Sequence, residues 1–269
     1  MRKQQYQTRV NGVSIAYQVS GSGPPLVCCH AMGWDHTLWD NIRGALSKRH
    51  TLITLDQRGC GASEHPPLAH GDANPYTVDT FADDLEGVLD ELGLQQANIL
   101  GFSMGAVAAL RLATRAPERV ERLVLASAMA SRLPEPIIER ARKVAQMVET
   151  DGLAQTYRFY FSGPLFEGVP RTPAFNQQLD ACVRWATPHG FLGCFGVTID
   201  RPSMADDLHE ISAPTLILVG ERDVHYLDEA ELMATRIPRA EKVIVPEVGH
   251  AMSYQAPALF VDKVLSFLP

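Results

Sequence analysis

The chain has 269 residues, of which 46% are hydrophobic, and its formal net charge at neutral pH is -7. This length suffices for one large domain with a sizeable core. An acidic chain without a basic run is poorly suited to nucleic acid or an anionic membrane surface, so we expect its partner to be a small molecule.

We expect the chain to be cytoplasmic, with no membrane segment. No apolar run approaches the about 20 residues that a membrane-spanning helix needs, and the polar start Met1–Tyr6 lacks the apolar core of a signal peptide. The cysteines number five, and Cys28 and Cys29 are neighbours in an apolar run. We expect these cysteines to be reduced core residues.

The first part of the chain predicts a hairpin and then strands that end in glycine-containing loops. Asn11–Gly12 readily takes the positive φ angles of a tight hairpin turn. Leu26–Cys29 is a fully apolar strand, and the loop His30–Gly33 follows it. Asp56–Ser63 forms a further glycine-containing turn, for which we expect a structural role.

The segment Ile99–Ala106 predicts a buried strand, a Gly-x-Ser-x-Gly turn and the start of a helix. A strand that reverses this sharply into a helix strains the serine backbone and leaves no room for side chains two residues before and after it. Gly101 and Gly105 meet that requirement. The helix N-terminus faces the place where an oxyanion would form, with the Met104 N–H as its natural donor. The pattern therefore predicts that Ser103 is a nucleophile.

After Leu125 the chain loses strand character until Thr215, and apolar residues recur at helical spacing instead. We expect an α/β core made of residues 1–133 and 209–269, and a helical cap made of residues 134–208. Such a cap would cover the edge of the sheet where ligands bind, and it would set the choice of substrate. The expected cap helices run around Ile137–Val148, Leu153–Phe161, Phe175–Trp185 and Phe191–Val197.

Two later strands carry the partners that a serine nucleophile needs. Pro214–Gly220 is a short apolar strand, and Asp223 follows it by three residues. Glu241–Pro246 predicts another strand, and His250 follows it after a glycine. Strand, acid, strand and histidine in this order favour Asp223 as the acid and His250 as the base. The alternatives are Glu221 and Asp228 for the acid, and His36, His189 and His225 for the base.

Together these segments resemble the α/β-hydrolase superfamily. The resemblance implies an α/β-hydrolase fold, with a mostly parallel eight-stranded sheet flanked by helices and a helical cap after strand six. It also implies an oxyanion hole made by the N–H groups of Met32 and Met104. The loop His30–Gly33 is similar to the family's His-Gly-x-Gly loop, but Ala31 stands where glycine is usual, which leaves open whether Ala31 or Met32 supplies the amide. We expect His30 to support this loop through a hydrogen bond.

Three segments, Met32–Asp40, Ala126–Arg132 and Thr187–Cys194, are similar to the 3-oxoadipate enol-lactonase group. The substrate of that group is an anionic enol lactone, so the resemblance implies that Arg132 holds a carboxylate. The alternative is that Arg132 is a surface residue. Aromatic side chains that could line the pocket, or simply fill the core, are Trp34, Trp185 and Phe191.

The function expected from these residues is a serine hydrolase that cleaves a small carboxylic ester or lactone through an acyl-enzyme. No metal or organic cofactor is needed for this chemistry. A carbon–carbon bond hydrolase of aromatic degradation or a cofactor-free perhydrolase would use the same three residues. A slow-turnover ligand sensor of the same fold is a further alternative. The sequence does not determine the oligomeric state.

Overall fold

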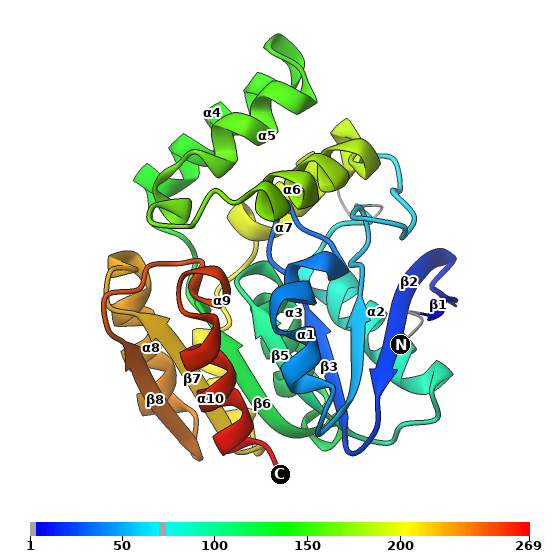
Figure 1. Ribbon diagram of the computed structural model, residues 1–269, viewed down its shortest axis with the longest axis vertical. Helices are drawn as coiled ribbons and strands as arrows, with labels where there is room; N and C mark the ends of the chain where they lie inside the picture. Colours follow the sequence, from blue (N-terminus) through cyan, green and yellow to red (C-terminus); the bar gives the residue numbers. More distant parts are fainter. Residues whose placement is uncertain (1–3, 70–73) are drawn as a thin grey trace.

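The computed structural model describes residues 4–69 and 74–269, so Met1–Lys3 of the polar start lie outside the described residues. Within these ranges the chain forms one sheet of eight strands in the order β1-β2-β4-β3-β5-β6-β7-β8 (Figure 1). The pairs β1–β2 and β2–β4 are antiparallel and the other pairs are parallel. The strands are β1 (Gln4–Val10), β2 (Val13–Gly21), β3 (Pro25–Cys29), β4 (Thr51–Leu55), β5 (Ala97–Phe102), β6 (Val120–Ala126), β7 (Thr215–Gly220) and β8 (Ala240–Val245).

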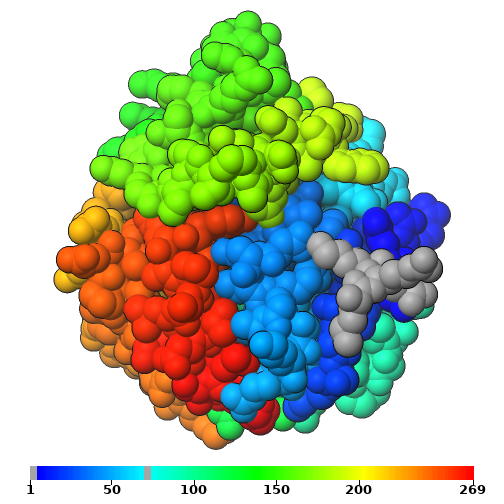
Figure 2. Space-filling view, in the orientation of Figure 1, coloured from blue at the N-terminus to red at the C-terminus, as the bar shows by residue number. Residues whose placement is uncertain are grey.

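Helices cover both faces of the sheet, as the sequence predicts for parallel strands joined by crossovers. In Figure 1 α1 and α10 lie in front of the sheet, whereas α2, α3 and α8 lie behind it. The space-filling view shows α1 and α10 side by side on the near face (Figure 2). The helices are α1 (Asp40–Leu46), α2 (Val78–Glu91), α3 (Met104–Arg115), α4 (Glu135–Thr150), α5 (Leu153–Phe161), α6 (Pro173–Trp185), α7 (Pro188–Ile199), α8 (Val224–Arg236), α9 (Met252–Gln255) and α10 (Pro257–Phe267).

The predicted hairpin forms between β1 and β2. Asn11 has a φ of 49° and Gly12 a φ of 83°, and Val10 pairs with Val13 across the turn. Positive φ at both central residues gives the turn the twist that a two-residue hairpin needs. This agreement and the strand order confirm the mostly parallel α/β-hydrolase sheet predicted from the sequence.

Helices α4 to α7 fill the chain between β6 and β7 and lie above the sheet in Figures 1 and 2. Two of them begin with a threonine followed by proline, a favoured start because the threonine oxygen accepts a free N–H and proline needs no acceptor. The Thr172 side chain caps α6 and the Thr187 side chain caps α7. We call residues 134–208 the helical cap.

The helical cap is joined to the core by specific polar contacts. The Gln178 side chain in α6 donates to the Thr37 carbonyl and accepts from the Tyr254 hydroxyl at 2.8 Å. The thiols of Cys60 in the core and Cys194 in α7 lie 3.5 Å apart, both buried. These contacts hold the helical cap over the carboxyl ends of the parallel strands.

The turn Asp56–Ser63 is structural, as expected. The Arg58 guanidinium is 2% exposed and makes two hydrogen bonds of 2.6 Å with the Asp84 carboxylate in α2. The Asp56 carboxylate accepts the Ala62 N–H at 2.9 Å, and Ser63 bridges the Asp56 carbonyl and β2. These hydrogen bonds connect the turn after β4 to α2 and to β2.

No helix among residues 4–69 and 74–269 is long and apolar enough to span a membrane.

Candidate active site

Ser103 lies at the junction of β5 and α3, where the chain reverses. Its φ is 51° and its ψ is -113°, a backbone conformation that costs a non-glycine residue of order 1–3 kcal/mol. The N–H groups of Ala106 and Val107, in the first turn of α3, donate to the Ser103 carbonyl at 2.9 and 3.2 Å. The strained junction therefore presents the serine hydroxyl beyond the carboxyl end of the central strand.

The two glycines of this turn are required by close backbone contacts. A Cβ built at Gly101 would lie 2.5 Å from the Cα of Ala106, and a Cβ at Gly105 would lie 2.2 Å from the Cys29 carbonyl oxygen. Both distances are far below van der Waals contact, and the obstructing atoms belong to the backbone. The glycines therefore let α3 pack against β5 and β3, as the sequence pattern predicts.

The structure brings Ser103, His250 and Asp223 together. The His250 Nε2 lies 3.0 Å from the Ser103 Oγ, and the His250 Nδ1 lies 2.8 Å from the Asp223 Oδ2. The histidine and the aspartate are each 5% exposed. A hydrogen bond from Nδ1–H to the carboxylate leaves Nε2 free to accept the serine proton.

Gly220 allows the loop that carries His250 to approach β7. A Cβ at Gly220 would lie 2.3 Å from the Val248 carbonyl oxygen and 2.4 Å from that of Gly249. The loop is further fixed because the Val248 carbonyl accepts the Arg222 N–H at 2.8 Å. Because Gly220 has no side chain, the histidine loop lies close to the end of β7, and this approach sets the distance between His250 and Asp223.

The alternative acids and bases have other partners. The Glu221 carboxylate accepts the Glu247 N–H at 2.8 Å, so it supports the histidine loop from outside, and Asp228 is exposed. The His36 ring lies 2.7 Å from the Asp56 carboxylate. His189 lies in α7 and no contact joins it to Ser103, whereas His225 lines the cavity beside the serine.

The loop after β3 lies beside Ser103, and hydrogen bonds of the buried His30 side chain hold it in place. His30 is fully buried, with its Nδ1 2.9 Å from the Ala31 carbonyl oxygen and its Nε2 accepting the Gln57 N–H at 3.0 Å. Burial lowers the pKa of His30, which fits a neutral ring with one donor and one acceptor. Met32 lines the cavity next to the serine, and Met104 begins α3, where N–H groups have no acceptor within the helix.

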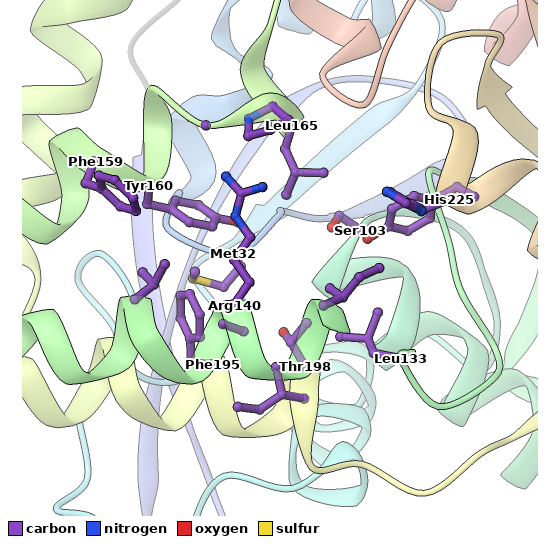
Figure 3. Close-up of a pocket in the computed structure, with 17 residues that line it drawn as sticks. Met32, Ser103, Leu133, Arg140, Phe159, Tyr160, Leu165, Phe195, Thr198 and His225 are labelled. Carbon is purple, nitrogen blue, oxygen red and sulfur yellow. The ribbon is translucent and has the colours of Figure 1, made fainter. Parts of the chain in front are cut away.

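A cavity of about 230 Å³ opens above Ser103, beneath the helical cap. Figure 3 shows Ser103 and His225 at one end of it and Phe159 and Tyr160 at the other. Its walls are mostly apolar, and none of the described residues that line it is acidic. They are Met32, Ser103, Leu133, Ile137, Arg140, Ala141, Val144, Phe159, Tyr160, Gly163, Pro164, Leu165, Phe195, Thr198, Ile199, His225 and Tyr226.

Arg132 and Trp185 do not line this cavity, which corrects two expectations. The Arg132 side chain is 58% exposed and its nearest acid is Glu135, at 3.9 Å. Trp185 is 60% exposed at the end of α6. Both side chains are largely exposed, so the surface alternative for Arg132 is the one that the structure supports.

Trp34 and Phe191 are core residues, which corrects two more expectations. Trp34 is 2% exposed and stacks on Tyr254 at 5.2 Å between ring centroids, with the edge of Phe161 at 5.1 Å. Phe191 is also 2% exposed and lies 4.9 Å from Phe195. Their rings contact aromatic residues of the cap, and neither residue is among the described residues that line the cavity.

Arg140 was not among the expected site residues, although the sequence carried a signal for it. In the helix predicted around Ile137–Val148, Ile137, Ala141 and Val144 share one apolar face, and Arg140 lies on the same face of α4. All four residues line the cavity, and Figure 3 shows the Arg140 guanidinium reaching toward Leu165. The sequence signal for Arg140 was therefore a positively charged residue on an otherwise apolar helix face.

Tyr226 was missed as well. It lies three residues after Asp223, at the start of α8, and its ring is 4.6 Å from the His250 ring. Burial raises the pKa of the Tyr226 hydroxyl, and the charge of Asp223 adds to this effect. Tyr226 is thus a neutral polar wall beside the serine and the histidine.

Asp35, His36 and Asp56 form the one cluster of described residues with the spacing of metal ligands, within 4.8 Å of one another. Their ligand atoms already have protein partners. The Asp56 Oδ1 accepts the His36 N–H at 2.7 Å, and the Asp35 carboxylate accepts the Thr37 N–H at 2.8 Å. The cluster therefore fits a structural role below the loop that follows β3.

Comparison with known proteins agrees with this fold. A family model described as alpha/beta hydrolase fold matches residues 24–257. The chain is 26% identical to 3-oxoadipate enol-lactonase 2 of Acinetobacter baylyi over 258 residues, which cover 94% of this chain and 92% of that relative. It is 28% identical to a pimeloyl-[acyl-carrier protein] methyl ester esterase of Nitrosomonas europaea over 273 residues, which cover 93% of this chain and 97% of that relative.

A solved structure of a thermophilic esterase from Thermogutta terrifontis is 26% identical and matches with a TM-score of 0.80 over 99% of this chain and 97% of that one. The family model covers most of the chain, and it spans the segments that carry Ser103, Asp223 and His250. The chain therefore belongs to the α/β-hydrolase fold family.

Proposed function

We propose that the protein is a serine hydrolase that cleaves a small carboxylic ester or lactone through an acyl-enzyme. The observation that carries this proposal is the chain of hydrogen bonds from Ser103 through His250 to Asp223, at 3.0 and 2.8 Å, opening on a mostly apolar cavity. The similarity to an enol-lactonase and to esterases supports the choice of bond.

The first half of the reaction forms the acyl-enzyme. The Ser103 Oγ attacks the scissile carbonyl carbon while His250 Nε2 accepts its proton, and the Asp223 carboxylate stabilises the imidazolium. The oxyanion that forms accepts hydrogen bonds from the Met32 and Met104 N–H groups, each of which contributes about 3 kcal/mol by analogy with other oxyanion donors. Collapse of this intermediate breaks the ester bond, and the imidazolium returns its proton to the leaving alcohol oxygen.

The second half releases the acid. Water attacks the acyl carbon as His250 takes its proton, and the ester bond to Ser103 breaks when the proton passes to the serine oxygen. For a lactone, the leaving alcohol remains attached to the acyl group as the ring opens. The apolar walls of the cavity favour an acyl group or leaving group with hydrocarbon character.

The first test is steady-state hydrolysis of p-nitrophenyl acetate and of 3-oxoadipate enol lactone by the wild type and by Ser103→Ala. We expect the variant to lose about 10⁴-fold or more in kcat while keeping its melting temperature. The same substitution at Ser266, exposed on α10, is the matched control and should leave kcat unchanged. Preference between the two substrates assigns the bond class.

A second readout examines the nucleophile directly. A fluorophosphonate that phosphonylates serine nucleophiles should label the peptide containing Ser103, and intact-protein mass spectrometry should show one addition. Comparable turnover in Ser103→Ala, or labelling elsewhere, would remove the assignment. A single burst without turnover on both substrates would instead favour the ligand sensor.

A further inference from the structure

A second arginine, Arg201, lies buried beside the nucleophile and is not used by the proposed mechanism. Arg201 follows α7, is 5% exposed, and lines a small hollow together with Ser103 and Met104. The hollow has a volume of about 10 Å³, which is room for about one water-sized group. It adjoins the main cavity, because four residues line both: Ser103, Leu133, Thr198 and Tyr226.

The guanidinium of Arg201 is only partly paired. Its Nη1 donates to the Ala130 carbonyl at 3.2 Å and its Nη2 to the Met129 carbonyl at 2.8 Å. Its Nε–H is buried and has no acceptor among the described residues. Arginine carries donors and no acceptor, so only an acceptor atom can satisfy this N–H.

The charge of Arg201 is only partly balanced by a neighbouring acid. Within the described part of the chain no carboxylate forms an ion pair with it. The acid whose charge acts on it, Glu229, accepts the N–H groups of Ala130 and Ser131 at 2.9 and 3.0 Å. Burial lowers the pKa of Arg201, and the charges of Tyr226 and Glu229 offset only part of this effect.

The surrounding walls reinforce this positive character. Among the residues that the structure describes, no acid lines the main cavity or the hollow, although the whole chain carries a net charge of -7. The other polar side chains that line the hollow are the hydroxyls of Ser103, Ser127, Thr198 and Tyr226. The Ser127 hydroxyl donates to the His250 carbonyl and the Thr198 hydroxyl to the Cys194 carbonyl, each at 3.1 Å. This leaves the buried Nε–H of Arg201 as a donor for an anionic oxygen.

We infer that the hollow is a subsite for one carboxylate oxygen of the substrate, close to the scissile carbonyl, with Arg201 as the residue that recognises it. The inference rests on the proposed function, since it names the substrate class of the same site. Arg140 is a second cation of the main cavity, but it is exposed on α4 and lies outside the hollow's lining. The carboxylate is therefore assigned to the buried arginine.

The test measures binding, so that it does not depend on hydrolysis. Three methyl esters of matched shape are titrated by NMR into Ser103→Ala: monomethyl succinate, methyl levulinate and methyl 4-methylpentanoate. They place a carboxylate, a ketone or a branched hydrocarbon at the same distance from the ester. We expect the carboxylate to bind about tenfold or more tightly than the hydrocarbon, with the ketone between them, since a hydrogen bond to a charged group is the stronger kind.

The variants separate the subsite from other sources of positive charge. Adding Arg201→Gln should abolish the preference for the carboxylate, whereas Arg132→Gln on the surface should leave it unchanged. If Arg140→Gln abolishes the preference and Arg201→Gln keeps it, the mouth of the cavity recognises the anion and the inference is overturned. Equal binding of all three esters to Ser103→Ala would also overturn it.

A purely structural role for Arg201 predicts a different pattern. In that case Arg201→Gln lowers the melting temperature and weakens the binding of all three esters equally. If this variant does not fold, Arg201→Lys reports on the same hollow: it should weaken carboxylate binding severalfold and leave hydrocarbon binding unchanged. Failure of hydrolysis by the wild type, with the carboxylate preference intact, would overturn the proposed function but not the subsite.

Discussion

Replacing Gly220 by alanine should separate the histidine from the serine without unfolding the protein. Gly220 ends β7 and has an ordinary backbone conformation, so only space opposes a side chain there. An added Cβ would lie 2.3 Å from the Val248 carbonyl oxygen and 2.4 Å from that of Gly249. Both atoms belong to the backbone of the loop that ends in His250, so this loop must move.

The size of the movement follows from these distances. A Cβ contact shorter than 3.0 Å is essentially never found, so the Val248 carbonyl must retreat by about 0.7 Å. If His250 follows its loop, the 3.0 Å between its Nε2 and the Ser103 Oγ becomes about 3.7 Å, which is beyond hydrogen-bond distance. Misplacement of a catalytic group by about 1 Å costs on the order of 10²-fold in rate. We therefore expect kcat/KM to fall by about 10- to 100-fold.

The assay is kcat/KM on whichever ester or lactone the wild type hydrolyses, together with the melting temperature. The matched control is Gly44→Ala in α1, where an added Cβ meets no described atom within 4 Å. That variant should keep full activity and gain slightly in stability, because alanine is the better helix former. A folded Gly220→Ala with kcat/KM within about twofold of the wild type would refute the reasoning.

Two further predictions concern stability. Asp84→Ala leaves the Arg58 guanidinium buried without its carboxylate, so the free energy of unfolding should fall by about 3–5 kcal/mol in urea titrations.

A second prediction concerns the pH dependence of the His36–Asp56 pair. Burial lowers the pKa of His36, but the hydrogen bond and charge of Asp56 outweigh this effect, so the net shift of the His36 pKa is upward. Burial likewise raises the pKa of Asp56, and His36 outweighs it, so the net shift is downward.

The signs of these shifts define a pH window. The contribution of His36 is complete below its ordinary pKa of about 6.5 and is lost as the pH rises through the raised value in the folded state. The contribution of Asp56 is present above its ordinary pKa of about 3.9 and is lost as the pH falls through the lowered value. The stability difference between the wild type and His36→Gln should therefore be greatest between about pH 4 and 6.5. A difference that grows from about pH 7 to 9 would contradict the assignment.

The control for Asp84→Ala is Asp79→Ala. Asp79 forms an ion pair with Arg111 at 2.6 Å, but its side chain is 50% exposed, so the loss should stay below about 1 kcal/mol. Equal losses of unfolding free energy in the two variants would show that burial does not make the Arg58–Asp84 pair more stabilising than the exposed Asp79–Arg111 pair.

The sequence by itself determined the fold and the order of the segments that meet at the site. Strand periodicity, the Asn11–Gly12 turn and the glycines around Ser103 are local constraints, because each depends on backbone conformation or contact with the next element. The same local logic placed an acid after β7 and a histidine after β8. Parallel strands bring their carboxyl ends to one edge of the sheet, so these residues meet there.

Only the tertiary structure decided which side chains surround that serine. Periodicity shows that the helix carrying Phe191 has an apolar face, but not whether that face meets core or cavity, and the loop position of Trp34 is equally uninformative. Neither aromatic residue could therefore be distinguished from a pocket residue. Arg132 lies on the surface, whereas Arg201 is buried beside Ser103. Arg132 follows β6 and Arg201 follows α7, and neither element has an unusual sequence pattern. The surroundings of both arginines depend on how the helical cap packs over the sheet. That packing joins segments far apart in the chain, which no local pattern encodes.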